Sequence, residues 1–194
     1  MAQQERKGRV IRINRAPVLT MWAAVVAERL GHPWDEALTI GRVVAGLAAY
    51  RKGVSLGIYE ERPEDARARL REKALAGETR EISLFGFRVL EVKTEAGWRA
   101  VDVDGDIIDP RAVERYLRRK FGDAYEEALA AMRALAAAYS PEELAQRGWR
   151  LYMMFRPQVP EGIEGWGRPG ELDIGKIWEM ARQAQQARDA ESDS

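Results

Sequence analysis

The residues best suited to chemistry form a basic stretch between Arg111 and Lys120, RAVERYLRRK. At helical spacing, Val113, Tyr116 and Leu117 would face the protein and the cations would face solvent. Arginine presents a planar fork of N–H donors that suits phosphate oxygens. We therefore predict a surface that binds nucleic acid or another phosphate-bearing partner, made by this helix and by basic residues near the N-terminus: Arg111, Arg115, Arg118, Arg119, Lys120, Arg9, Arg12 and Arg15. The alternative is a solvated helix face whose arginines pair with nearby acids.

A second candidate site is the stretch 156–170, which is rich in proline and glycine and is predicted to form a long loop. Trp166 and Arg168 would line a pocket beneath it, which would make the protein an enzyme or a small-ligand-binding protein. The tryptophan would equally serve to anchor the loop. No glycine spacing here matches a phosphate-binding fingerprint.

Familiar catalytic chemistry has little support in this sequence. There is no cysteine, no Gly-x-Ser-x-Gly motif, and the single histidine, His32, precedes a proline. The acidic run from Asp102 to Asp109 could offer oxygen ligands to a hard cation, but Asp104-Gly105 is first of all a hairpin signal. We predict no catalytic residue, no metal and no cofactor, and lean towards a protein that is not an enzyme.

Composition sets the broad class. The 194 residues include 31 basic and 31 acidic side chains, so net charge attracts neither nucleic acid nor acidic lipid. No apolar run is long enough to span a membrane, and the N-terminus is basic and polar, unlike a secretory signal. We expect a cytoplasmic protein with one domain over residues 1–194, comprising a flexible basic arm (1–8), the loop 156–170 and a disordered acidic tail (186–194).

The element that organises the chain is predicted to be a helical hairpin over residues 18–52. Apolar residues recur at steps of three and four on both sides of the junction at Gly31, and Gly53 is predicted to end the second helix. The pair also has some features of a DNA-binding helix-turn-helix, with Arg42 in the second helix. Its spacing is too long for that motif, and its second helix is largely apolar, which favours a core hairpin.

The remaining segments predict an α+β fold, mainly helical, with a small three-stranded antiparallel meander. Strands are expected at 9–13, 81–94 (with a bulge at Gly86), 98–103 and 106–108, and 54–59 is expected to be extended. Helices are expected at 63–76, 110–121, 123–139 and 140–155, and from residue 173. Asp109, Asp123 and Ser140 are the predicted helix caps.

Two segments resemble a family of uncharacterised bacterial proteins: INRAPVLTMWAAVVAERLGHPWDEALTIGRVVAGLAAY (13–50) and FRPQVPEGIEGWGRPGELD (155–173). The resemblance implies a bacterial cytoplasmic protein and brings no activity, ligand or catalytic residue with it. The leading hypothesis is thus a binding module for a phosphate-bearing partner. The alternatives are a ligand pocket beneath residues 156–170 and a homodimer formed through the apolar helix 124–139.

Overall fold

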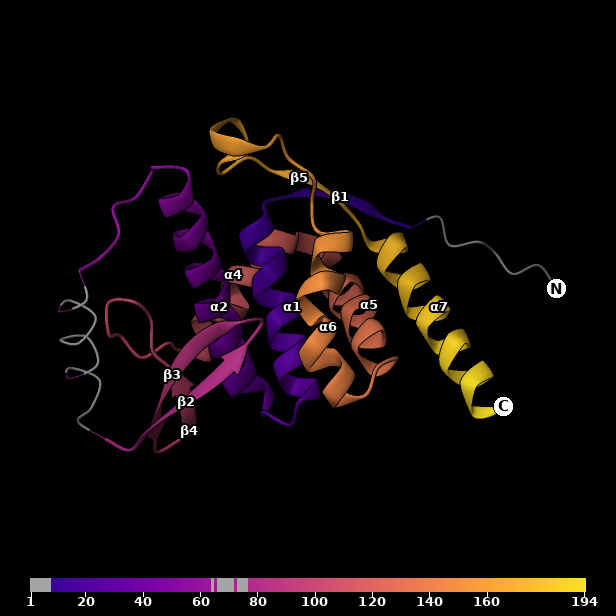
Figure 1. Ribbon diagram of the computed structural model, residues 1–194, viewed down its shortest axis with the longest axis horizontal. Coiled ribbons are helices and arrows are strands. Elements are labelled where there is room, and N and C mark those ends of the chain that lie inside the picture. The colour runs from indigo at the N-terminus through magenta and orange to yellow at the C-terminus, as the bar shows by residue number, and fades with distance from the viewer. Residues whose placement is uncertain (1–7, 64, 66–71, 73–76) are drawn as a thin grey trace.

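The computed structural model describes residues 8–63, 65, 72 and 77–194, and it confirms the central helical hairpin (Figure 1). Helix α1 spans Arg15–Arg29 and α2 spans Trp34–Ser55. Every residue of α1 from Pro17 to Ala27 is buried, so this helix is enclosed on all sides rather than along one stripe. Gly41 of α2 lies against the backbone of α1, where a Cβ would overlap the carbonyl of Thr20. A side chain at this position would therefore push the two helices apart.

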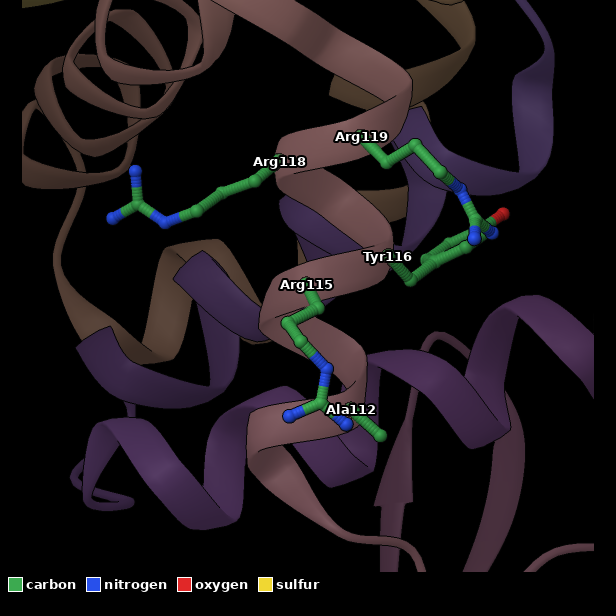
Figure 2. A pocket seen from close by; sticks show the side chains of 5 residues that line it. All are labelled: Ala112, Arg115, Tyr116, Arg118 and Arg119. Atoms are coloured by element: carbon green, nitrogen blue, oxygen red, sulfur yellow. The ribbon is translucent and has the colours of Figure 1, made fainter.

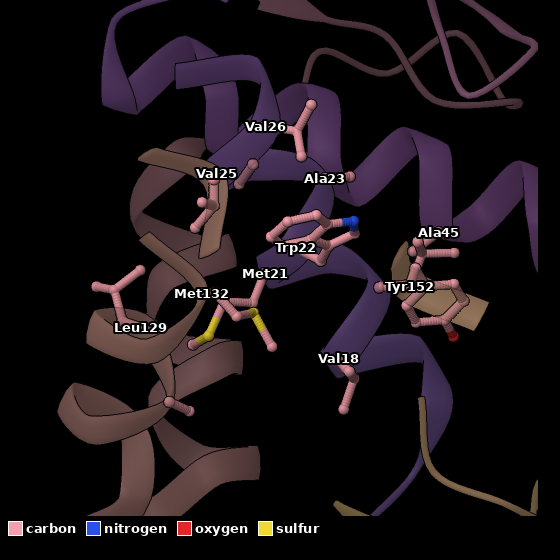
Figure 3. Packing of buried hydrophobic residues seen from close by; sticks show 14 of the residues in the cluster. Val18, Met21, Trp22, Ala23, Val25, Val26, Ala45, Leu129, Met132 and Tyr152 are labelled. Carbon is pink, nitrogen blue, oxygen red and sulfur yellow. The ribbon is translucent and has the colours of Figure 1, made fainter. Parts of the chain in front are cut away.

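Later in the chain lie the α-helices α4 (Pro110–Phe121), α5 (Tyr125–Ala137), α6 (Pro141–Phe155) and α7 (Ile174–Ser192). Helix α5 packs between α1 and α7. Apolar side chains from α1, α5 and α6, among them Met21, Met132 and Tyr152, fill the same interior region (Figure 3). Because α1 and α7 cover the buried stripe of α5, that stripe is not exposed for the predicted homodimer contact.

The three-stranded antiparallel sheet is present, although its strands differ from the predicted ones. Strands β2 (Thr79–Leu84), β3 (Phe87–Thr94) and β4 (Gly97–Ala100) pair in that order. The predicted strand 81–94 is therefore a hairpin. Phe85 and Gly86, both with positive φ, form its two-residue turn, so the bulge at Gly86 was wrong. The predicted strand 106–108 contributes only one bridge, between Ile107 and Val101.

A second sheet joins the two ends of the described chain. Strand β1 (Val10–Ile13), within the predicted range 9–13, pairs antiparallel with β5 (Gly170–Asp173). Strand β5 was not predicted. It has only four residues and follows a proline- and glycine-rich loop, so its alternation of apolar and polar residues is too short to indicate a strand. Side-chain bonds fasten the loop to the hairpin: Asn14 donates to the carbonyl of Gly167 (2.7 Å), and Arg15 donates to that of Pro157 (2.7 Å).

Two of the three predicted helix caps are confirmed. The Asp109 side chain accepts a hydrogen bond from the backbone N–H of Arg111 (3.0 Å), and Ser140 forms a reciprocal capping box with Glu143. Asp123 was wrong as a cap, since it lies inside a short 3₁₀ turn, η1 (Gly122–Ala124), and its carboxylate pairs with Arg9 instead. A turn that leads directly from α4 into α5 leaves no extended residue to act as a cap.

Several predicted boundaries also differ. Helix α2 continues past Gly53 to Ser55, so the prediction of an extended segment at 54–59 was wrong. The ring of Tyr59 packs directly against the buried Gly53. A 3₁₀ turn, η2 (Gly162–Gly165), interrupts the loop 156–170. Residues 186–192, predicted to be disordered, are helical in α7, supported by local bonds such as Ser192 to the carbonyl of Arg188 (3.0 Å). The predicted helix 63–76 and residues 1–7 of the predicted arm lie essentially outside the described residues.

Candidate nucleic-acid interface

Helix α4 presents the basic side chains that the sequence singled out. Asp109 caps its start, Gly122 with φ of 59° ends it, and Val113, Leu117 and Phe121 are buried against the body. Its last turn carries Arg118, Arg119 and Lys120, which favourably oppose the negative end of the helix dipole. The helix is thus firmly fixed, and its cations lie at the surface.

The arginine side chains of α4 spread out in different directions from the helix. Residues three and four apart share a helix side, so Arg115 adjoins Arg111 and Arg118 in one direction around the helix and Arg119 in the other. In Figure 2, Arg118 extends to one side of the helix, Tyr116 and Arg119 extend to the other, and Arg115 lies between them. The four arginines therefore arise from one side of the helix, while the guanidinium groups of Arg118 and Arg119 lie apart.

Arg118 is occupied by contacts within the chain. Its guanidinium donates to Glu126 (3.0 Å) and to Glu114 (3.2 Å), and it stacks over the ring of Tyr125 at 4.2 Å. Arg111, on the same side, lies 3.7 Å from the carboxylate of Asp109. Two carboxylates already neutralise Arg118, so it would have to exchange them for any phosphate.

Three other cations of α4 differ from Arg118 in their contacts. Arg115, Arg119 and Lys120 are exposed, and in the described part of the chain none of them forms an ion pair. Arg42 of α2, also exposed and likewise without an ion pair among the described residues, places its guanidinium 4.5 Å from the centre of the Tyr116 ring. We call Arg42, Arg115, Arg119 and Lys120 the α2–α4 basic surface. An open depression next to it is lined by Ala112, Arg115, Tyr116, Arg118 and Arg119.

The N-terminal arginines do not join this surface as a group. Arg9 pairs with Asp123, and Arg15 is half-buried, where burial and the neighbouring Arg156 lower its pKa. Arg12 is exposed on β1 opposite Glu171 of β5. Tertiary contacts thus occupy Arg9 and Arg15, and a linear sequence does not show those contacts.

The structure places the two predicted ligand-loop residues apart from any large groove that it shows. Trp166 is half-buried and packs edge-on against Tyr59, with ring centres 5.7 Å apart, while Arg168 is exposed. A groove of about 590 Å³ lies elsewhere, between the second half of α2 and the sheet, and includes Leu47, Arg51 and Leu90. No residue of the loop 156–170 lines that groove, so Trp166 acts here as a loop anchor.

A buried cluster of ionisable side chains was missed by the sequence analysis. Glu91 of β3 is completely buried, and Glu36 of α2 nearly so. Arg80 of β2 donates to both carboxyl groups, through Nε to Glu91 (2.7 Å) and through Nη2 to Glu36 (2.5 Å). The Nδ1 atom of His32 lies 2.9 Å from Oε1 of Glu36. The guanidinium of Arg80 also stacks on Trp98, 4.1 Å from the ring centre.

The two carboxyl groups titrate very differently. Burial, followed by a hydrogen bond to Glu36, raises the pKa of Glu91 to about 7. Burial would also raise the pKa of Glu36, but hydrogen bonds from Glu91, His32 and Arg80 together lower it. The pair therefore binds one proton more tightly, and the other more weakly, than isolated glutamates would.

One signal for this cluster was present in the sequence. Phe87, Val89 and Glu91 alternate along β3 and all are buried, so the acid occupies an inward position of the strand. An acid in phase with apolar residues is the pattern that would have identified Glu91.

Comparison with protein-family models, with curated proteins and with solved structures finds no match in any of the three. The resemblance of residues 13–50 and 155–173 to uncharacterised bacterial proteins therefore stays a prediction. Within the described residues, no helix has the length and apolar character needed to cross a membrane.

Proposed function

We propose that the protein is a binding module for nucleic acid and that it contacts the phosphate backbone through the α2–α4 basic surface. The observation that carries the proposal is the presence of four exposed cations, Arg42, Arg115, Arg119 and Lys120, that lack ion pairs among the described residues. Cations that are not neutralised by their own chain are available to a polyanion. Binding to phosphates would release counterions from the nucleic acid, which favours association.

The arrangement favours contacts to phosphates over contacts to bases. Tyr116 is the aromatic residue at the centre of the surface, and the guanidinium of Arg42 already lies over its ring. A nucleobase would have to displace Arg42 in order to stack there. Arginines that contact only phosphates position a protein on nucleic acid without reading its sequence. We therefore expect little sequence preference. We also expect duplex DNA to bind at least as tightly as single-stranded DNA.

The test is direct binding to labelled duplex DNA, single-stranded DNA and RNA, at about 50 and 200 mM salt. Four phosphate contacts would weaken duplex binding by about 10²-fold over that range. The double variant Arg115→Glu/Arg119→Glu should abolish binding, because it reverses two neighbouring charges of the surface. Its circular dichroism should be unchanged, since neither side chain is buried.

Arg147→Glu/Arg150→Glu is the matched control, since both residues are exposed and lie on another helix, α6. It makes the same change in net charge and should retain binding. Equal loss in both double variants would mean that only net charge matters and would contradict an interface on α4. Absence of binding to all three nucleic acids at low salt would reject the proposed function.

A further inference from the structure

The buried cluster of Glu36, Glu91, Arg80 and His32 lies where the three-stranded sheet meets the helical hairpin. Glu36 and His32 come from the hairpin, and Arg80 and Glu91 come from neighbouring strands of the sheet. The sheet also contacts the hairpin through apolar packing, through Arg99 and Asp35 (3.9 Å), and through the N–H of Ala100, which donates to the hydroxyl of Thr39 (2.9 Å). Charged groups therefore make a large part of this contact.

We propose that the cluster is a proton-sensitive latch, in which one proton shared by Glu36 and Glu91 holds the β2–β3–β4 sheet on the α1–α2 hairpin. Loss of that proton loosens the attachment while the helical core stays folded. This inference concerns a face distinct from the α2–α4 basic surface and does not depend on the proposed function.

The geometry calls for a proton between the carboxyl groups. Oε2 of Glu91 accepts a hydrogen bond from Arg80, whereas no protein donor reaches the buried Oε1 in the described part of the chain. Oε1 of Glu36 accepts a hydrogen bond from Arg80 and lies 2.9 Å from Nδ1 of His32. A proton on Oε1 of Glu91, donated to Glu36, supplies the missing hydrogen bond and removes the repulsion between two buried charges.

The charges around the pair do not replace that proton. The guanidinium of Arg80 is the cation that contacts both carboxyl groups, and His32 contributes a charge only when protonated. On the neighbouring strand β4, Arg99 lies 3.9 Å from Asp35 of α2, and on β3, Lys93 pairs with Glu78. After deprotonation, two buried carboxylates share the single guanidinium of Arg80. This excess of negative charge disfavours the contact between the sheet and the hairpin.

Hydrogen–deuterium exchange, resolved by peptide, measures the latch directly. The opening equilibrium of residues 79–100 should rise roughly tenfold between about pH 5.5 and pH 7.5, after correction for intrinsic exchange rates. The opening of α5 serves as the internal reference and should stay constant. Glu91→Gln keeps the shape of the protonated acid and should remove the pH dependence of the sheet.

Two further variants keep the test decisive. Glu36→Gln leaves Glu91 as a lone carboxylate beside Arg80 and should also remove the pH dependence, which provides an answer if Glu91→Gln does not fold. Glu95→Gln, at an exposed position in the β3–β4 turn, should behave like the wild type. A sheet whose opening does not change with pH in the wild type would overturn the proposal. So would a dependence that persists in the glutamine variant of either Glu36 or Glu91.

Discussion

The indole N–H of Trp22 donates a hydrogen bond to the backbone carbonyl of Gly148 (2.8 Å), across 126 positions of the chain. Trp22 is fully buried in α1, and its ring meets Phe155 edge-on with ring centres 5.4 Å apart. Gly148 of α6 also receives the ring of Phe85 from the β2–β3 turn. The central hairpin, α6 and the sheet therefore meet at one point.

Replacing Trp22 by phenylalanine should destabilise the protein by about 1–3 kcal/mol, from the lost hydrogen bond together with the space left by the smaller ring. Urea unfolding followed by circular dichroism measures this change. Trp178→Phe is the control, because that side chain is only half-buried and should cost less. Equal effects of the two substitutions would show that the bond to Gly148 adds little.

Two glycines of α2 should respond to alanine in opposite directions. At Gly41 a Cβ would overlap the Thr20 carbonyl, so Gly41→Ala should destabilise the protein by about 1–3 kcal/mol or more. At the exposed Gly46 nothing lies within 4 Å, and Gly46→Ala should stabilise the helix by about 0.5–1 kcal/mol. Thermal melts of the two variants test this contrast, and a shift in the same direction would refute the close helix crossing.

Stability should depend on pH through the glutamate pair. Because the pKa of Glu91 is raised from 4.5 to about 7, its contribution is full below pH 4.5 and is lost as the pH rises towards 7. The lowered pKa of Glu36 acts in the opposite sense, so its contribution is present above pH 4.5 and is lost below it. The contribution of the pair should therefore be greatest near pH 4.5. As the pH rises from 4.5 towards 7, the urea midpoint of the wild type should fall relative to that of Glu91→Gln. Midpoints that change in parallel with pH would argue against the raised pKa of Glu91.

Arg118 and Arg119 are adjacent in sequence but should differ in nucleic-acid binding. Arg118 is held by Glu114 and Glu126, whereas Arg119 has no ion pair in the described residues. Arg119→Ala should weaken binding to duplex DNA and reduce the slope of its salt dependence by about one phosphate contact. Arg118→Ala should leave affinity nearly unchanged. The reverse order would place the interface on the α5 side of α4.

The sequence by itself determined the local features of this protein. The α+β class, the helical hairpin, the cap at Asp109 and the capping box at Ser140 depend on apolar spacing and on side-chain bonds over a few residues. These signals are short-range, and therefore a linear pattern contains them. The basic character of α4 is likewise a property of its own ten residues.

Only the tertiary structure decided which charged side chains are available. Arg118 and Arg119 look alike in the sequence, and it is the packing of α5 against α4 that brings Glu126 to one and not to the other. The pairing of β1 with β5 and the meeting of Glu36 with Glu91 join segments that are distant in sequence. Such contacts depend on how whole elements pack, because a buried charge is tolerated only where the fold delivers its partner.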